Sequence, residues 1–181
     1  MPVNLPIVLT WLRIGLIPVF VGVFYIPWYW APPLSASLFA LAAVTDWADG
    51  YLARKWDQTS RFGAFLDPVA DKLMVAAALI LLIQQYATAW LTLAAIIIIG
   101  REITISALRE WMAEVGQRGK VAVAALGKIK TTTQMLALIL LLYQHPISSF
   151  DLRLPGLILL YISVVLTVVS MFQYLAAAFE S

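Results

Sequence analysis

Four aspartates between residues 46 and 71 are the residues best suited to do chemistry. They form two pairs, Asp46 with Asp49 and Asp67 with Asp71, at spacings of three and four residues. If both segments are helical, these spacings place each pair on one face of its helix. Two antiparallel helices would then direct four carboxylates at one point, and such a cluster needs a cation between its charges.

The ligand types indicate which cation this is. Carboxylate oxygens are hard ligands that suit Mg²⁺ or Mn²⁺. The chain has no cysteine and one histidine, which argues against a zinc site or an iron–sulfur cluster. The sequence therefore predicts a divalent-cation site, and the group that such a site typically binds is phosphate.

Small residues and one arginine accompany the aspartates. Gly50 and Ala53 each follow an aspartate of the first pair by four residues, and Gly63 precedes Asp67 by four. On a helix these residues share the face of the carboxylates and leave room for a ligand. Arg54 adds a planar guanidinium that suits phosphate oxygens.

With its spacing, the stretch reads Asp-x2-Asp-Gly-x2-Ala-Arg-x8-Gly-x3-Asp-x3-Asp, and at every specified position it resembles the CDP-alcohol phosphotransferase family. Three further segments resemble the bacterial glycerol-3-phosphate phosphatidyltransferases of that family, the phosphatidylglycerophosphate synthases: NLPIVLTWLR at 4–13, REITISALREWM at 101–112 and GKIKT at 127–131. The resemblance covers nearly the whole chain. It implies one domain over residues 1–181 and a homodimer.

The resemblance also implies a reaction and its residues. Members of the family transfer a phosphatidyl group from a CDP-linked lipid to an alcohol and release CMP. Two divalent cations, Mg or Mn, would be bound by Asp46, Asp49, Asp67 and Asp71. Asp71 would also take the proton of the attacking hydroxyl. Gly50, Ala53 and Gly63 would leave space for the cytidine, and Arg54 would bind the diphosphate.

Basic residues on later helices predict a small anionic acceptor, for which the resemblance implies sn-glycerol 3-phosphate, with CDP-diacylglycerol as the donor. The candidates for binding its phosphate are Arg101, Arg109, Lys128 and Lys130. Thr10 and Arg13, in the N-terminal family-like segment, are candidates for substrate contact.

These basic residues have a structural alternative. Arg101 and Arg109 would pair with Glu102 or Glu110, and the two lysines would anchor their helix at the membrane surface.

Composition indicates that lipid surrounds most of the chain. Hydrophobic residues make up 62% of the sequence and the mean hydropathy is +0.89, far above a soluble domain. The length allows about six spans. We expect an all-α membrane bundle with a short interfacial segment at 1–10, spans near 11–30, 34–55, 62–83, 89–99, 122–143 and 154–178, and a turn at 84–86. The fourth helix should continue to residue 114.

Two further expectations concern proline and charge. Pro68 either begins a helix in its first turn or kinks one.

The net charge of +2 is too small to indicate nucleic acid binding. If the spans alternate in direction, eleven of the twelve Lys and Arg residues lie on one side, which the positive-inside rule makes cytoplasmic together with both termini and the aspartates. A bacterial inner membrane follows from the resemblance.

Other functions remain open at this point. The aspartates could pair structurally with nearby arginines and lysines, although ionisable groups at membrane depth are usually functional. An intramembrane Mg-dependent prenyltransferase also uses paired aspartate motifs, but it needs more spans than fit here. A cation transporter would need acids near the midplane that are reachable from both sides. Within the family, inositol phosphate or phosphatidylglycerol would be the competing acceptor.

Overall fold

The computed structural model describes residues 5–55, 61–115, 125–147 and 150–179. Helices make up nearly all of these residues, which confirms the predicted all-α class. They are α1 (Leu5–Tyr25), α2 (Ala31–Lys55), α3 (Arg61–Tyr86), α4 (Ala89–Glu114), α5 (Ala125–Tyr143) and α6 (Arg153–Phe179).

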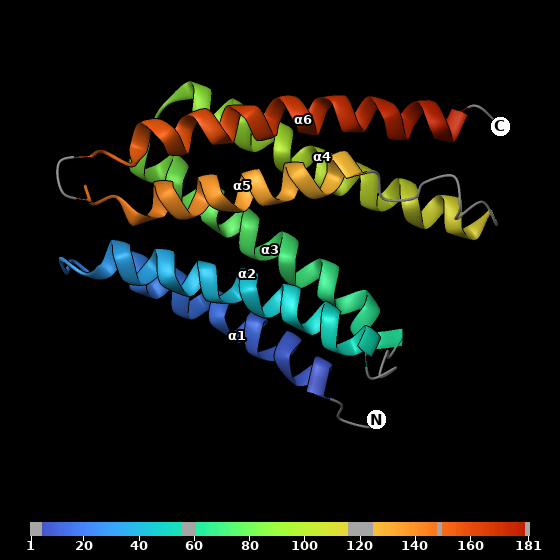
Figure 1. Cartoon of the computed structure of the whole chain (residues 1–181), viewed down its shortest axis with the longest axis horizontal. Coiled ribbons are helices and arrows are strands. Elements are labelled where there is room, and N and C mark those ends of the chain that lie inside the picture. The colour runs from blue at the N-terminus through green and yellow to red at the C-terminus, as the bar shows by residue number, and fades with distance from the viewer. Residues whose placement is uncertain (1–4, 56–60, 116–124, 148–149, 180–181) are drawn as a thin grey trace.

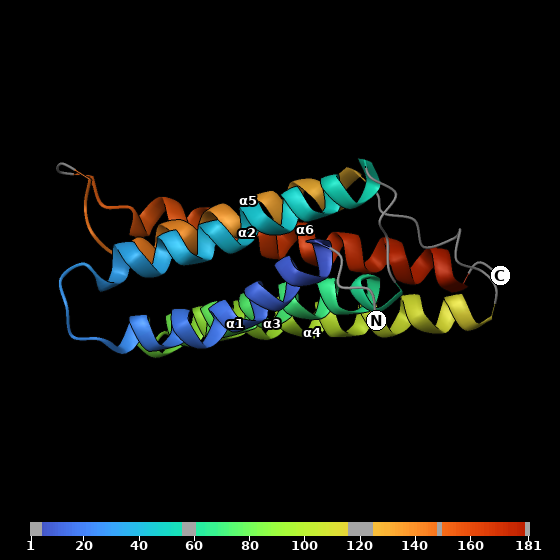
Figure 2. The same cartoon turned by 90° about the horizontal axis from the view of Figure 1, so that it is seen from below.

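The helices pack as a closed ring. Going around it, α1 contacts α2, α2 contacts α5, α5 contacts α6, α6 contacts α4, α4 contacts α3, and α3 returns to α1. α3 also contacts α2 and α5 across the ring. Figure 2 shows α2 and α5 on one side of the bundle and α1, α3 and α4 on the other. α1 begins and α6 ends at the same end of the bundle, where α2 also ends and α3 begins (Figure 1).

The interior of the ring combines bulky and small apolar side chains. Phe20, Phe39, Leu79 and Leu138 are fully or almost fully buried. Alanines fill the remaining positions and allow helix backbones to approach closely, as is common between membrane helices: Ala36, Ala42, Ala78, Ala94 and Ala137.

The outer surface is apolar as well. Trp90 is 72% exposed, and Ile96, Ile103, Val165 and Phe172 are also well exposed. A soluble protein rarely leaves so many large apolar side chains in water. Among the described residues, two segments are long and apolar enough to cross a membrane, Ala89–Glu114 and Arg153–Ala176, with shorter apolar helical stretches at Thr10–Tyr25 and Ile129–Tyr143.

Some predicted boundaries need correction. The interfacial segment expected at 1–10 is not a separate element where it is described, because Leu5–Thr10 form the start of α1, and proline at position 6 is tolerated in a first helical turn. The turn expected at 84–86 is wrong. α3 ends at Tyr86, and the next residue, Ala87, has a left-handed φ of 46°.

Pro68 lies inside α3 and does not start it. The structure therefore excludes the alternative in which Pro68 begins a helix in its first turn, and α3 continues on both sides of the proline. Its missing N–H leaves the carbonyl four residues earlier without its helical donor. Pro68 itself lies between Asp67 and Asp71, the two aspartates of the second pair.

Gly156 lies where α6 packs closely against α5, and it gives a test of this packing. A Cβ at position 156 would lie 2.9 Å from Leu141 Cγ, whereas a Cβ at Gly100 would meet nothing within 4 Å. We expect Gly156→Ala to lower thermal stability in detergent, because overpacking costs about 1–3 kcal/mol. Gly100→Ala is the matched control and should raise stability by about 0.5–1 kcal/mol. Equal effects of the two substitutions would contradict the close contact.

Candidate active site

Three of the four predicted aspartates lie near one another on two helices that pack together. Asp46 lies on α2, and Asp67 and Asp71 lie on α3. Asp46 and Asp71 line the same cavity. The negative charge of Asp46 acts on both Asp67 and Asp71, so all three carboxylates belong to one electrostatic cluster. The structure thus brings Asp46 and Asp71 to one cavity, and the convergence of all four carboxylates on one point stays a prediction.

The remaining motif residues lie on these same two helices. Asp49, Gly50, Ala53 and Arg54 are on α2 and Gly63 is on α3. Their side chains lie outside the described part of the structure, so their predicted roles stay predictions.

α1 supplies partners for the aspartates. The Thr10 hydroxyl donates a hydrogen bond to Asp67 Oδ1. Arg13 Nη1 lies 2.7 Å from Asp46 Oδ1. Thr10 and Arg13 are 0% and 1% exposed, and α1 packs on both helices that carry the acids. The two residues that the sequence suggested as substrate contacts thus contact the motif aspartates directly.

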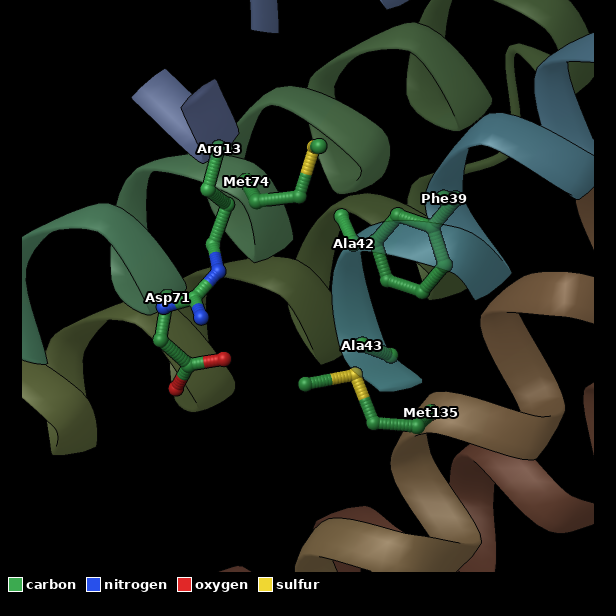
Figure 3. A pocket seen from close by; sticks show the side chains of 7 residues that line it. All are labelled: Arg13, Phe39, Ala42, Ala43, Asp71, Met74 and Met135. Atoms are coloured by element: carbon green, nitrogen blue, oxygen red, sulfur yellow. The ribbon is translucent and has the colours of Figure 1, made fainter. Parts of the chain in front are cut away.

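Arg13 also lies beside Asp71. Both line a small cavity with Phe39, Met74 and Met135, and Figure 3 shows the guanidinium next to the Asp71 carboxylate. The positive charge of Arg13 acts on Asp71 as well as on Asp46. One buried guanidinium therefore offsets part of the repulsion between carboxylates on two different helices.

Two larger cavities meet at Asp71. The first, about 390 Å³, lies between α2 and α5, and apart from Asp46, Asp71 and two threonines its lining is apolar: Ala40, Ala43, Val44, Met135, Leu136 and Ile139. The second, about 40 Å³, is lined by charged and polar side chains together with Val75 and Met135: Asp71, Lys72, Glu102, Lys130, Thr131 and Gln134. Asp71 therefore borders both an apolar space and a polar one.

The residues predicted to bind the phosphate of the acceptor differ in their contacts. Lys130 is buried, lines the polar cavity and donates a hydrogen bond to Glu102 Oε1. Arg101 Nη1 lies 3.1 Å from the same oxygen, and its Nη2 donates to Ser170 Oγ at 3.1 Å. Arg109 donates to the Tyr174 hydroxyl at 2.9 Å. The side chain of Lys128 lies outside the described part.

Glu102 therefore holds two of the predicted basic residues in place. This agrees with the structural alternative for Arg101, since the ion pair with Glu102 exists. It leaves open the binding role, because Glu102 itself borders the polar cavity beside Lys130. Tyr174 lies beneath both arginines, with its ring centre 5.5 Å from Arg101 Cζ and 5.2 Å from Arg109 Cζ. Arg101 and Arg109, eight residues apart on α4, lie along one stripe of that helix.

The donor chemistry of the cluster fits a hard divalent cation. Asp46 and Asp71 present carboxylate oxygens to one cavity, and the chain has no cysteine to favour a softer metal. Among the residues whose side chains are described, no three acidic or histidine side chains are grouped closely enough to hold an ion by themselves. Asp49 is the one motif acid outside this description.

Comparison with known proteins decides the family. The model of the CDP-alcohol phosphatidyltransferase family matches residues 3–169. This chain belongs to the CDP-alcohol phosphatidyltransferase family. It is therefore a membrane-bound transferase of phosphatidyl groups. Members of this family generally depend on divalent metal ions.

Individual relatives match over almost their full length. A protein of Pectobacterium atrosepticum is 57% identical over 98% of this chain and 96% of its own length. Relatives from Yersinia enterocolitica (55% identical, 99% and 97% covered) and Salmonella typhimurium (54% identical, 98% and 96% covered) are similarly close. All three carry the name CDP-diacylglycerol–glycerol-3-phosphate 3-phosphatidyltransferase.

Sequence reasoning did not assign a role to Gln134. It lies four residues after Lys130, on the same face of α5, and borders the polar cavity. That spacing was the signal that could have pointed to it.

The contact between Arg13 and Asp46 can be tested by a double-mutant cycle. Arg13→Met should lower thermal stability because it removes the guanidinium that offsets the repulsion between Asp46 and Asp71. Adding Asp46→Asn to this variant should restore part of the loss. We expect a coupling energy of about 1–3 kcal/mol, limited by the partial exposure of Asp46. Melting in detergent with a chelator present measures the effect without bound metal. Simple additivity of the two substitutions would show that the pair is not coupled.

Proposed function

We propose that this chain transfers the phosphatidyl group of CDP-diacylglycerol to sn-glycerol 3-phosphate, giving phosphatidylglycerophosphate and CMP. The observation that carries the proposal is the position of Asp71 between an apolar and a polar cavity. The names and 54–57% identities of the relatives support the same substrates.

The apolar cavity suits the donor. It lies between α2 and α5 and contains Asp46 and Asp71 among aliphatic side chains. A nucleotide-linked lipid has a diphosphate that needs polar partners and acyl chains that need an apolar path to the bilayer. In this proposal the diphosphate lies at the aspartates and the acyl chains leave between the helices. Gly50, Ala53 and Gly63 leave room for the cytidine, and Arg54 binds the diphosphate.

The polar cavity suits the acceptor. Lys130 and Lys72 supply positive charge beside Asp71, and a small phosphate ester needs a cation at one end and a base at the other. Lys130 binds the phosphate in this proposal, with Lys128. Arg101 and Arg109 contribute from α4, where Glu102 connects Arg101 to the cavity.

Proton transfer is assigned to Asp71. The acceptor hydroxyl oxygen forms a bond to the phosphatidyl phosphorus, the bond from that phosphorus to the oxygen of CMP breaks, and CMP leaves with the electron pair. The hydroxyl proton passes to Asp71. Arg13 orients the Asp46 carboxylate by its ion pair, and Thr10 orients the Asp67 carboxylate by its hydrogen bond.

Two divalent cations, Mg or Mn, are proposed as cofactors. When bound by Asp46, Asp49, Asp67 and Asp71, they would neutralise charge on the diphosphate and on the leaving oxygen. The oxygen-only donor set of the described aspartates supports this assignment.

Placement in the membrane follows from charge. We propose six spans with both termini in the cytoplasm of a bacterial cell and the protein in its inner membrane. Eleven of the twelve Lys and Arg residues fall on one side when the helices alternate, and this bias marks the cytoplasmic side. The site would then open to the compartment that holds soluble phosphate esters. The homodimer stays a prediction of the family resemblance.

The substrate assignment can be tested with purified protein in detergent micelles. CDP-diacylglycerol is supplied with glycerol 3-phosphate, inositol phosphate or phosphatidylglycerol, and CMP release is measured with Mg²⁺, with Mn²⁺ and with a chelator. We expect release with glycerol 3-phosphate and loss of release with the chelator. Activity with inositol phosphate and none with glycerol 3-phosphate would overturn the acceptor.

Asp71→Asn tests the base. Because the amide keeps the shape but cannot take up the proton, turnover should fall by about 10²–10⁴-fold, while folding and most of the CMP binding remain. Glu110→Gln on the exposed surface of α4 is the control for loss of one acid. Near-normal turnover of Asp71→Asn would remove Asp71 from this role.

A further inference from the structure

Gln134 on α5 has a buried hydrogen-bonding atom without a partner. The residue is 4% exposed, and its Oε1 makes no hydrogen bond to any of the described residues. Buried side-chain carbonyls are nearly always paired, because an unmatched one costs about 1–3 kcal/mol. An unpaired atom of this kind suggests a donor that arrives with a ligand.

The position of Gln134 indicates which ligand. It lines the polar cavity together with Asp71, Glu102 and Lys130. Lys130 lies one helical turn before it, so both side chains face the same space. Glu102 already accepts hydrogen bonds from Lys130 and Arg101. Gln134 Oε1 is thus an uncharged acceptor beside this cavity that is buried and without a partner among the described groups.

The cavity has room for more than one water-sized group. At about 40 Å³ it exceeds the roughly 10–15 Å³ that one water needs. A three-carbon phosphate ester has three polar parts: the phosphate, the hydroxyl that attacks and the hydroxyl between them. The proposed function assigns the first to Lys130 and the second to Asp71, and it leaves the third without a protein partner.

We propose that Gln134 recognises this middle hydroxyl by accepting its hydrogen bond at Oε1, and so selects a glycerol phosphate over an acceptor that lacks the group. The inference rests on the proposed function, because it assumes that a glycerol phosphate occupies the polar cavity. It adds a specificity-determining residue that takes no part in proton transfer. A site built to bind a hydroxyl discriminates strongly against the analogue without it, since its polar group is then left unpaired.

The test compares sn-glycerol 3-phosphate with 3-hydroxypropyl phosphate, which has the phosphate and the attacking hydroxyl but no middle hydroxyl. CMP release gives kcat/KM for each. The wild type should prefer glycerol 3-phosphate by about ten- to a hundredfold. Gln134→Met, unbranched and of similar volume, should reduce this preference to within about threefold, mostly by raising KM for glycerol 3-phosphate.

Two further variants separate recognition from structural damage. Gln134→Glu retains an acceptor oxygen and should keep the preference even where its overall rate is lower. Leu138→Ala, one turn along α5 and fully buried in the core, should affect both acceptors equally because it only weakens packing. A changed preference in Leu138→Ala would overturn the proposal.

The outcomes distinguish this inference from the proposed function. Absence of any turnover of glycerol 3-phosphate by the wild type would refute the proposed function itself. Turnover of both acceptors by the wild type with equal kcat/KM would refute the role of Gln134, whether or not its variants fold. An undiminished preference in Gln134→Met would refute it as well.

Discussion

Repulsion between carboxylates is the constraint on which the rest of this structure depends. Asp46, Asp67 and Asp71 lie on two neighbouring helices, and the charge of Asp46 acts on both of the others. In a mostly apolar bundle such charges are weakly screened, so each needs a local partner. α1 provides these partners through Arg13 and Thr10. The packing of α1 against α2 and α3 therefore also supplies the polar partners that the aspartates on those helices need.

A second polar cluster stabilises the opposite half of the ring. Glu102 on α4 binds Arg101 of its own helix and Lys130 of α5, and Arg101 continues to Ser170 on α6. These contacts connect three helices by charged groups that would be costly to bury alone. The two clusters approach each other at Asp71, whose surroundings include Arg13 from one and Glu102 from the other. The position proposed for chemistry is thus where the two halves of the ring meet.

Sequence spacing predicted the helices that carry Asp46, Asp67 and Asp71, because the spacing within each pair reflects the periodicity of one helix. It did not predict where α3 ends. Ala87 adopts a left-handed conformation usually marked by glycine, so no residue type signalled that end.

Contacts between helices were also beyond the spacing rules. Thr10 and Arg13 were suggested as substrate contacts because they lie in the family-like N-terminal segment, and the sequence gave no sign that the ring brings them against Asp67 and Asp46. Gln134 escaped notice for the same reason. An uncharged polar residue on an apolar helix becomes informative only when the structure shows that its carbonyl is buried, unpaired and beside a cavity.

Charge balance explains why a cluster of this kind would depend on divalent ions. Among the described side chains of the two clusters, formal charges cancel, with four acids and four bases: Asp46, Asp67, Asp71 and Glu102, and Arg13, Lys72, Arg101 and Lys130. The proposed substrates would bring about two negative charges on the phosphate monoester and about two more on the diphosphate. These eight groups cannot compensate the added charge by rearranging their ion pairs, since every base released to a phosphate leaves an acid uncovered. Arg54, Arg109 and Lys128 against Asp49 would add only two net positive charges to the proposed site, fewer than the substrates would need. Additional positive charge must enter with the substrates, and divalent cations on carboxylate ligands supply it within the smallest space.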